Sequence, residues 1–135
     1  MAVAQRETFR SPYFRVLVDD GDAIVRIIRS SEPFQNLTVV RSAWLAVIEA
    51  LDRSGRANRC LLSDLREAPA RNDPEFEKVV TPLIPRALAG YRRNAILVRL
   101  AVGALQLRRH TKADGIERLI TSSEEEALRY LMEVL

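Results

Sequence analysis

Short apolar runs of strand length alternate with longer amphipathic stretches along most of this chain. Runs in which β-branched residues recur every second position are typical of strands, whereas apolar residues spaced by three and four are typical of one helix face. The expected strands span residues 13–19, 23–29, 60–65, 94–100 and 117–121, and the expected helices follow from residues 37, 74, 102 and 124. This order, ββαβαβαβα, predicts an α/β fold with a mainly parallel central sheet, an antiparallel hairpin at one end and helices packed on the sheet.

Length and composition favour one soluble domain. The 135 residues fit a single core, which we expect over residues 13–135, after an unstructured lead-in at residues 1–12. The net charge of +3 is too small to indicate a nucleic-acid partner, and no apolar run is long enough to span a membrane. The single cysteine, Cys60, cannot form an internal disulfide, which favours a cytoplasmic location, and we expect it in the core.

The helix expected from residue 74 carries an interruption. Asp73 is a suitable cap, and Pro74 suits the first helical position because its missing N–H would have no partner there. Pro82 and Pro85 then predict a kink or a break near Thr81.

The junction between the strand at residues 60–65 and this helix is the first candidate site. Ligand and partner sites of α/β proteins tend to lie at the carboxyl ends of strands. The junction holds six polar candidates, namely Asp64, Arg66, Glu67, Arg71, Asn72 and Asp73. Most of them have an ordinary alternative role, because Asp73 can cap the helix and the two arginines can pair with neighbouring carboxylates. Asp64 has no capping role, so it is either hydrogen-bonded to the loop or functional.

This element order, with the Leu61-Leu62-Ser63-Asp64-Leu65 strand end leading into a capped helix, resembles the STAS domain of the SpoIIAA-like bacterial anti-sigma-factor antagonists over about residues 13–135. The resemblance implies a non-enzymatic signalling module that binds partner proteins, often a kinase that phosphorylates a Ser or Thr near the following helix. Asp64 corresponds to the acidic residue just before that phosphoacceptor. The chain departs from the pattern, because residues 64–80 contain no Ser, Thr or Gly, so no phosphorylation site is predicted.

The sequence contains no complete motif for catalysis, metal binding or nucleotide binding. His110 is the only histidine, so a Ser-His-Asp or Cys-His site would have to use it, yet it lies in a basic stretch at an expected helix end. One Cys and one His are too few for a zinc site, and no glycine-rich nucleotide loop occurs. We therefore expect no catalytic residue, no metal and no cofactor.

Three functions follow from these observations. The preferred hypothesis is a non-catalytic regulatory or scaffolding module whose six junction residues bind a partner protein, for example a kinase or regulator. The first alternative is a small-molecule or lipid-anion binding domain with a pocket beside the kinked helix, in which Arg66 or Arg92 meets the anion. The second alternative is an enzyme that uses His110. A homo-oligomer is compatible with all three, with an interface expected at Met132, Val134 and Leu135.

Overall fold

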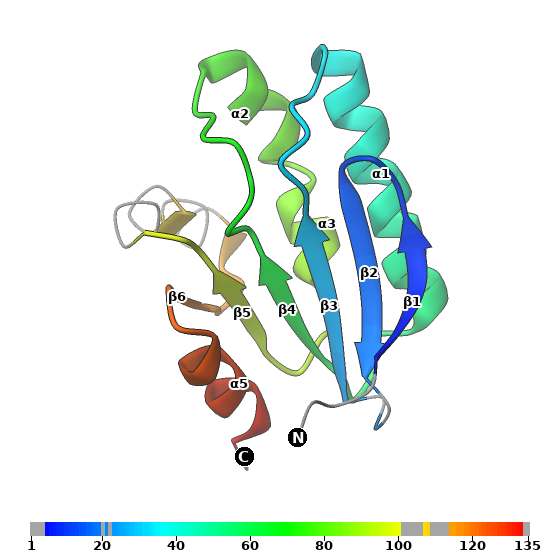
Figure 1. Cartoon of the computed structure of the whole chain (residues 1–135), viewed down its shortest axis with the longest axis vertical. Helices are drawn as coiled ribbons and strands as arrows, with labels where there is room; N and C mark the ends of the chain where they lie inside the picture. Colours follow the sequence, from blue (N-terminus) through cyan, green and yellow to red (C-terminus); the bar gives the residue numbers. More distant parts are fainter. Residues whose placement is uncertain (1–4, 20, 22, 101–106, 109–113, 134–135) are drawn as a thin grey trace.

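The computed structural model describes residues 5–19, 21, 23–100, 107–108 and 114–133. A six-stranded sheet carries helices on both faces, and its strands lie side by side in chain order, from β1 to β6 (Figure 1). The strands are β1 (Gln5–Arg10), β2 (Phe14–Asp19), β3 (Ile24–Arg29), β4 (Cys60–Asp64), β5 (Asn94–Leu97) and β6 (Leu119–Thr121). The helices are α1 (Leu37–Ser54), α2 (Pro74–Val80), α3 (Ile84–Leu88) and α5 (Glu124–Met132).

The predicted α/β class is confirmed, but the sheet is mixed rather than mainly parallel. The pairs β3–β4, β4–β5 and β5–β6 are parallel, as expected for strands joined by helical crossovers. The pairs β1–β2 and β2–β3 are antiparallel. The expected hairpin is thus the β2–β3 pair, and the strand before it extends the antiparallel part of the sheet.

The prediction of an unstructured lead-in over residues 1–12 is wrong for the part that the structure describes. Residues Gln5–Arg10 form β1, which pairs with β2 and contains a bulge between Glu7 and Phe9. Five of its six residues are exposed, and only Phe9 packs against the core. A charged edge strand of this kind is held by backbone pairing rather than by buried side chains, so it has no apolar alternation to detect.

The two faces of the sheet support separate cores. Successive residues of a strand point to opposite faces, so Leu61 packs in the larger core with α1 and α3, whereas Leu62 packs in a smaller core under α5. Cys60 is buried beside Leu62, as expected, and its Sγ donates to the carbonyl oxygen of Leu131 at 3.3 Å. Helix α5 therefore covers only the β4–β6 part of its face, and α1, α2 and α3 define the other side.

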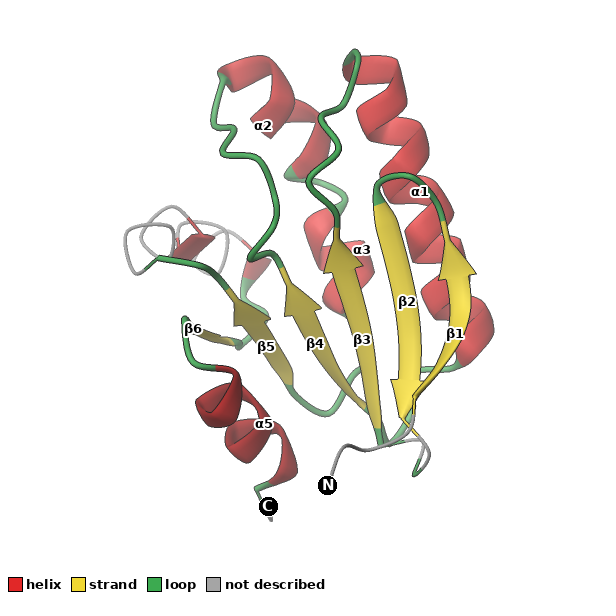
Figure 2. Ribbon diagram, in the orientation of Figure 1, coloured by secondary structure: helices red, strands yellow, loops and turns green. Residues whose placement is uncertain are grey.

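Side chains cap the N-termini of α1 and α2, and the cap of α2, Asp73, is the predicted one. The Asn36 side chain accepts a hydrogen bond from the Val39 amide at 2.9 Å, and Asp73 accepts one from the Phe76 amide at 3.2 Å. The expected break near Thr81 is confirmed, because α2 ends at Val80 and α3 begins at Ile84 after a turn (Figure 2). This break leaves two short helical segments, instead of one continuous rod, above the sheet.

The helix expected over residues 102–112 lies almost entirely outside the described residues, and His110 lies there too. The strand expected at residues 117–121 is the shorter β6. Within the part of the chain that the structure describes, none of the helices has the length and hydropathy that a membrane span requires.

Candidate functional site

Asp64 and Arg66, the central pair of the predicted junction, bind each other. Asp64 is 6% exposed at the end of β4. The Arg66 side chain donates to it twice, from Nε at 3.0 Å and from Nη2 at 2.8 Å, and the Arg66 backbone amide donates at 3.1 Å. Of the two alternatives for Asp64, the structure therefore shows the hydrogen-bonded one.

This pair belongs to a charge network on the α5 side of the sheet. Arg26 lies 3.9 Å from Asp64 and 2.7 Å from Glu124 at the start of α5, and Arg66 lies 3.5 Å from the same Glu124. Burial acts to raise the pKa of Asp64, but the hydrogen bonds from Arg66 and the charges of Arg66 and Arg26 outweigh it, so the pKa lies below its usual value. The network ties the end of β4 to α5.

Arg71 and Asp73 form a second, separate pair at the start of α2. Arg71 Nε donates to Asp73 at 2.7 Å, and its guanidinium lies 4.9 Å from the centre of the Phe76 ring. Asp73 also caps α2, as predicted. Glu67 follows the first pair and Asn72 lies between the two residues of the second pair, and both side chains are exposed. Four of the six junction residues thus form two ion pairs, one at each end of the loop.

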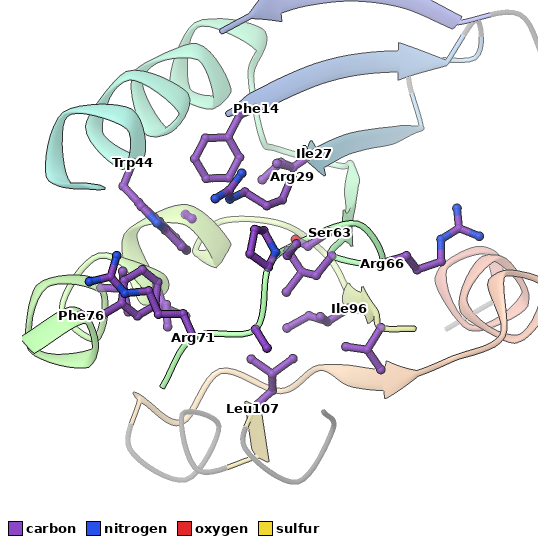
Figure 3. A pocket seen from close by; sticks show the side chains of 18 of the residues that line it. Phe14, Ile27, Arg29, Trp44, Ser63, Arg66, Arg71, Phe76, Ile96 and Leu107 are labelled. Carbon is purple, nitrogen blue, oxygen red and sulfur yellow. The ribbon is translucent and has the colours of Figure 1, made fainter. Parts of the chain in front are cut away.

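That loop forms one wall of a cavity of about 570 Å³. The floor is the sheet face that carries Ile27, Ser63 and Ile96, and further walls come from α1 and from the broken α2–α3 segment (Figure 3). The side chains that line it are mostly apolar, among them Phe14, Pro33, Phe34, Trp44, Val47, Leu65, Ala68, Pro69, Ala70, Phe76, Val80, Ile84, Ala87, Leu88 and Val98. A cavity of this size and lining is typical of a site for a small apolar molecule.

Arg29 is the unusual residue of this cavity. It is the last residue of β3, lines the cavity and is only 6% exposed. Its guanidinium lies 4.2 Å from the centre of the Phe34 ring and 5.8 Å from the rings of Tyr13 and Phe14. Nη1 donates to the Ser30 carbonyl oxygen at 2.7 Å and lies 3.4 Å from the Ser30 hydroxyl.

The rest of the Arg29 guanidinium has no partner within the part of the chain that the structure describes. Neither Nε nor Nη2 donates a hydrogen bond there, and no carboxylate there forms an ion pair with it. Burial lowers the pKa of Arg29, partly offset by Tyr13 and Glu32. The group nevertheless stays charged at neutral pH, because the arginine side chain is not deprotonated in proteins.

Other polar side chains of the cavity differ from Arg29. Arg118 is also buried, but its Nη2 pairs with Asp114 and its Nε donates to the Ile116 carbonyl oxygen at 3.1 Å. Arg66 extends toward α5 and pairs with Asp64 of β4 and with Glu124 of α5 (Figure 3). Ser63 is 7% exposed on the cavity floor, and its hydroxyl makes no hydrogen bond to a described residue.

The two arginines that the sequence offered for an anion, Arg66 and Arg92, lie differently with respect to the cavity. Arg66 lines the cavity but pairs with Asp64, whereas Arg92 is exposed, precedes β5 and does not line the cavity. Arg29 was missed, although a signal existed. It has the same parity in β3 as Val25 and Ile27, both of which are buried, so it must point toward the same core.

The other residues and sites considered from the sequence are not part of the cavity in the portion of the chain that the structure describes. Met132 is 58% exposed, whereas Val134 and Leu135 lie beyond the described residues. No cluster of three or more His, Cys, Asp or Glu side chains that could hold a metal ion occurs among the residues described.

Comparison with family models, with curated proteins and with solved structures finds no match for this chain. The resemblance to the STAS domain therefore stays a hypothesis, and function has to be argued from the cavity and its surroundings.

Proposed function

We propose that this chain is a non-catalytic binding module that holds a small, largely apolar molecule in the cavity between the sheet and the α2–α3 segment. The observation that carries the proposal is the cavity itself, about 570 Å³ lined mainly by aliphatic and aromatic side chains. Protein interiors are normally packed to crystal-like density, so a volume of this size beside a core is typical of a ligand site.

The break between α2 and α3 supports this proposal. Val80 at the end of α2 and Ile84, Ala87 and Leu88 in α3 all line the cavity. A continuous helix would keep one straight face against the sheet, whereas two short segments can curve around a bound molecule. Pro82 and Pro85 disfavour the continuous helix, so the sequence itself favours the broken shape of this cavity wall.

Trp44, the only tryptophan, lines the cavity and provides the test. We expect straight-chain alcohols to change its fluorescence in a saturable way. Burying one methylene contributes about 0.8 kcal/mol, so each added carbon should tighten binding roughly fourfold until the chain exceeds the cavity. Leu100→Ser is a matched control, because Leu100 is 59% exposed at the rim and should contribute little.

Two outcomes would contradict the proposal. One is a dissociation constant that does not depend on chain length from hexanol to decanol, which would indicate nonspecific adsorption. The other is a lack of any saturable signal, supported by native mass spectrometry that detects only the ligand-free mass after incubation with each alcohol.

A second candidate function is binding of a partner protein by the loop over residues 65–73, as in the STAS hypothesis. It is favoured by the exposed side chains of Glu67 and Asn72 on a loop that the Asp64–Arg66 and Arg71–Asp73 pairs fix at both ends. A fixed backbone presents these groups in a defined arrangement, which lowers the entropy cost of recognition. The double variant Glu67→Arg/Asn72→Arg leaves both ion pairs intact and should abolish capture of any specific partner; unchanged capture would remove this surface from consideration.

A further inference from the structure

The cation at the cavity wall indicates what kind of small molecule fits. The guanidinium of Arg29 is covered on one face by Phe34, at 4.2 Å from the ring centre, and uses Nη1 for the Ser30 carbonyl oxygen. Its Nε and Nη2 form the planar edge that donates two parallel hydrogen bonds to a carboxylate or phosphate in bidentate pairs. In Arg29 this edge has no acceptor among the residues that the structure describes.

A buried charge without a counterion is costly, so proteins normally pair it. A second buried arginine of the same cavity, Arg118, can be compared with Arg29. Arg118 is equally buried and lines the same cavity, yet Asp114 supplies its carboxylate. Aromatic contacts and the charge of Glu32 compensate Arg29 in part, but the rings occupy its face, and Glu32 forms no ion pair with its edge. Of the two buried cations, only Arg29 is free to accept an anion.

We propose that the ligand is a singly charged amphiphile, an apolar chain that ends in a carboxylate, whose head group pairs with the open edge of Arg29. This inference rests on the proposed binding function and specifies its ligand. One unpaired guanidinium balances one negative charge, which favours a carboxylate over a doubly charged phosphate monoester. Arg29 ends β3 on the face that carries Ile27 and Ser63, so the head group binds at the carboxyl ends of the strands and the chain extends over the apolar floor.

The first test uses the unmodified protein and Trp44 fluorescence with three ligands of equal chain length. Decanoate should bind at least about 30-fold more tightly than decanol, the range expected for a desolvated, hydrogen-bonded charge pair. Decyl phosphate should bind less tightly than decanoate at pH 8, where it carries two charges. Equal affinities for decanoate and decanol would overturn the anion assignment while leaving the apolar cavity function standing. Binding of neither compound would overturn both proposals.

The second test changes the cation. Arg29→Met keeps an unbranched apolar stem, and it should lose the preference for decanoate while changing decanol affinity less than threefold. Arg99→Met is the matched control, because Arg99 also lines the cavity but is exposed, and it should keep the preference. If Arg29→Met does not fold, Arg29→Lys retains the charge without the planar fork and should retain only part of the preference. A full preference for decanoate in either Arg29 variant would overturn the assignment.

Discussion

Leucine in place of Ser63 tests whether the cavity is an open volume in solution. Ser63 is 7% exposed in β4, and its register partners on the neighbouring strands are Ile27 and Ile96. All three residues line the cavity. A larger apolar side chain at position 63 therefore extends into the cavity from its floor, and the sign of its effect on stability depends on whether there is room for it.

The expected magnitude follows from the atoms added. Leucine replaces a hydroxyl that has no hydrogen bond to a described residue by three carbons. At about 0.8 kcal/mol per buried carbon, the gross gain is about 2.4 kcal/mol. Ordering the leucine side chain costs about 0.5–1 kcal/mol. The free energy of unfolding should therefore rise by roughly 1.5–2 kcal/mol, which corresponds to a Tm increase of about 5 °C or more in a domain of this size.

Urea unfolding followed by Trp44 fluorescence measures this change, and Ala95→Leu is the matched control. Ala95 lies on the adjacent strand, is 0% exposed and packs in the dense core under α5. Extra carbons in a filled core typically cost about 1–3 kcal/mol, so the control should be destabilised. If Ser63→Leu is destabilised by a similar amount, the volume is filled by protein in solution and the cavity argument fails. If it is stabilised, the same variant should also weaken decanol binding.

Three further predictions concern the frame around the site. Asp64→Asn should lower the free energy of unfolding by about 2–3 kcal/mol at pH 7. Because the pKa of Asp64 is lowered on folding, its contribution is complete above the unfolded pKa of about 4 and is lost as the pH falls through the folded pKa. Urea titrations from pH 7 to pH 2 should therefore show the difference from wild type shrinking below about pH 4; a constant difference would contradict the ion pair. Asn36→Ala removes the α1 cap and should cost about 1 kcal/mol by thermal unfolding, whereas no loss would mean that the cap is dispensable. Gly90→Ala should lower the free energy of unfolding by more than about 1 kcal/mol, because Gly90 has φ +85° and a Cβ there would lie 3.3 Å from Arg56. Gly21→Ala is the control and should be nearly neutral, because there is open space around Gly21. Equal effects of the two substitutions would exclude backbone strain as the cause.

Local sequence patterns were sufficient to predict most of the strands and helices around the site. The β-branched residues of β2 and β3, the caps Asn36 and Asp73, and the two prolines after Thr81 each act over a few residues, so their effects can be predicted without knowing the fold. Strand β1 could not be predicted in this way. Its stability comes from backbone bonds to β2, and the partner strand is not encoded in the polar sequence of residues 5–10.

The candidate site could be predicted only in part, because charge pairing is decided in three dimensions. Arg66 binds Asp64, two positions before it, which sequence proximity allows, but it also shares Glu124, 58 residues further along the chain, with Arg26. Arg29 shows the opposite case. Its inward direction follows from strand parity, yet its lack of a carboxylate partner is a property of the assembled cavity. The sequence therefore indicates which way a charged side chain points, but not which charged group it pairs with.

The loop over residues 65–73 connects the two candidate functions physically. Its two ends are fixed by the Asp64–Arg66 and Arg71–Asp73 pairs, Ala68, Pro69 and Ala70 between them line the cavity, and Glu67 is exposed on the same segment. If a bound amphiphile changes the arrangement of this loop that a partner protein recognises, the two binding free energies are coupled, and each ligand changes the affinity of the other by the same factor. A partner captured through Glu67 that leaves the dissociation constant of decanoate unchanged would show that the loop serves the two functions independently. A reciprocal change of equal size would identify the chain as a sensor whose ligand sets its partner affinity.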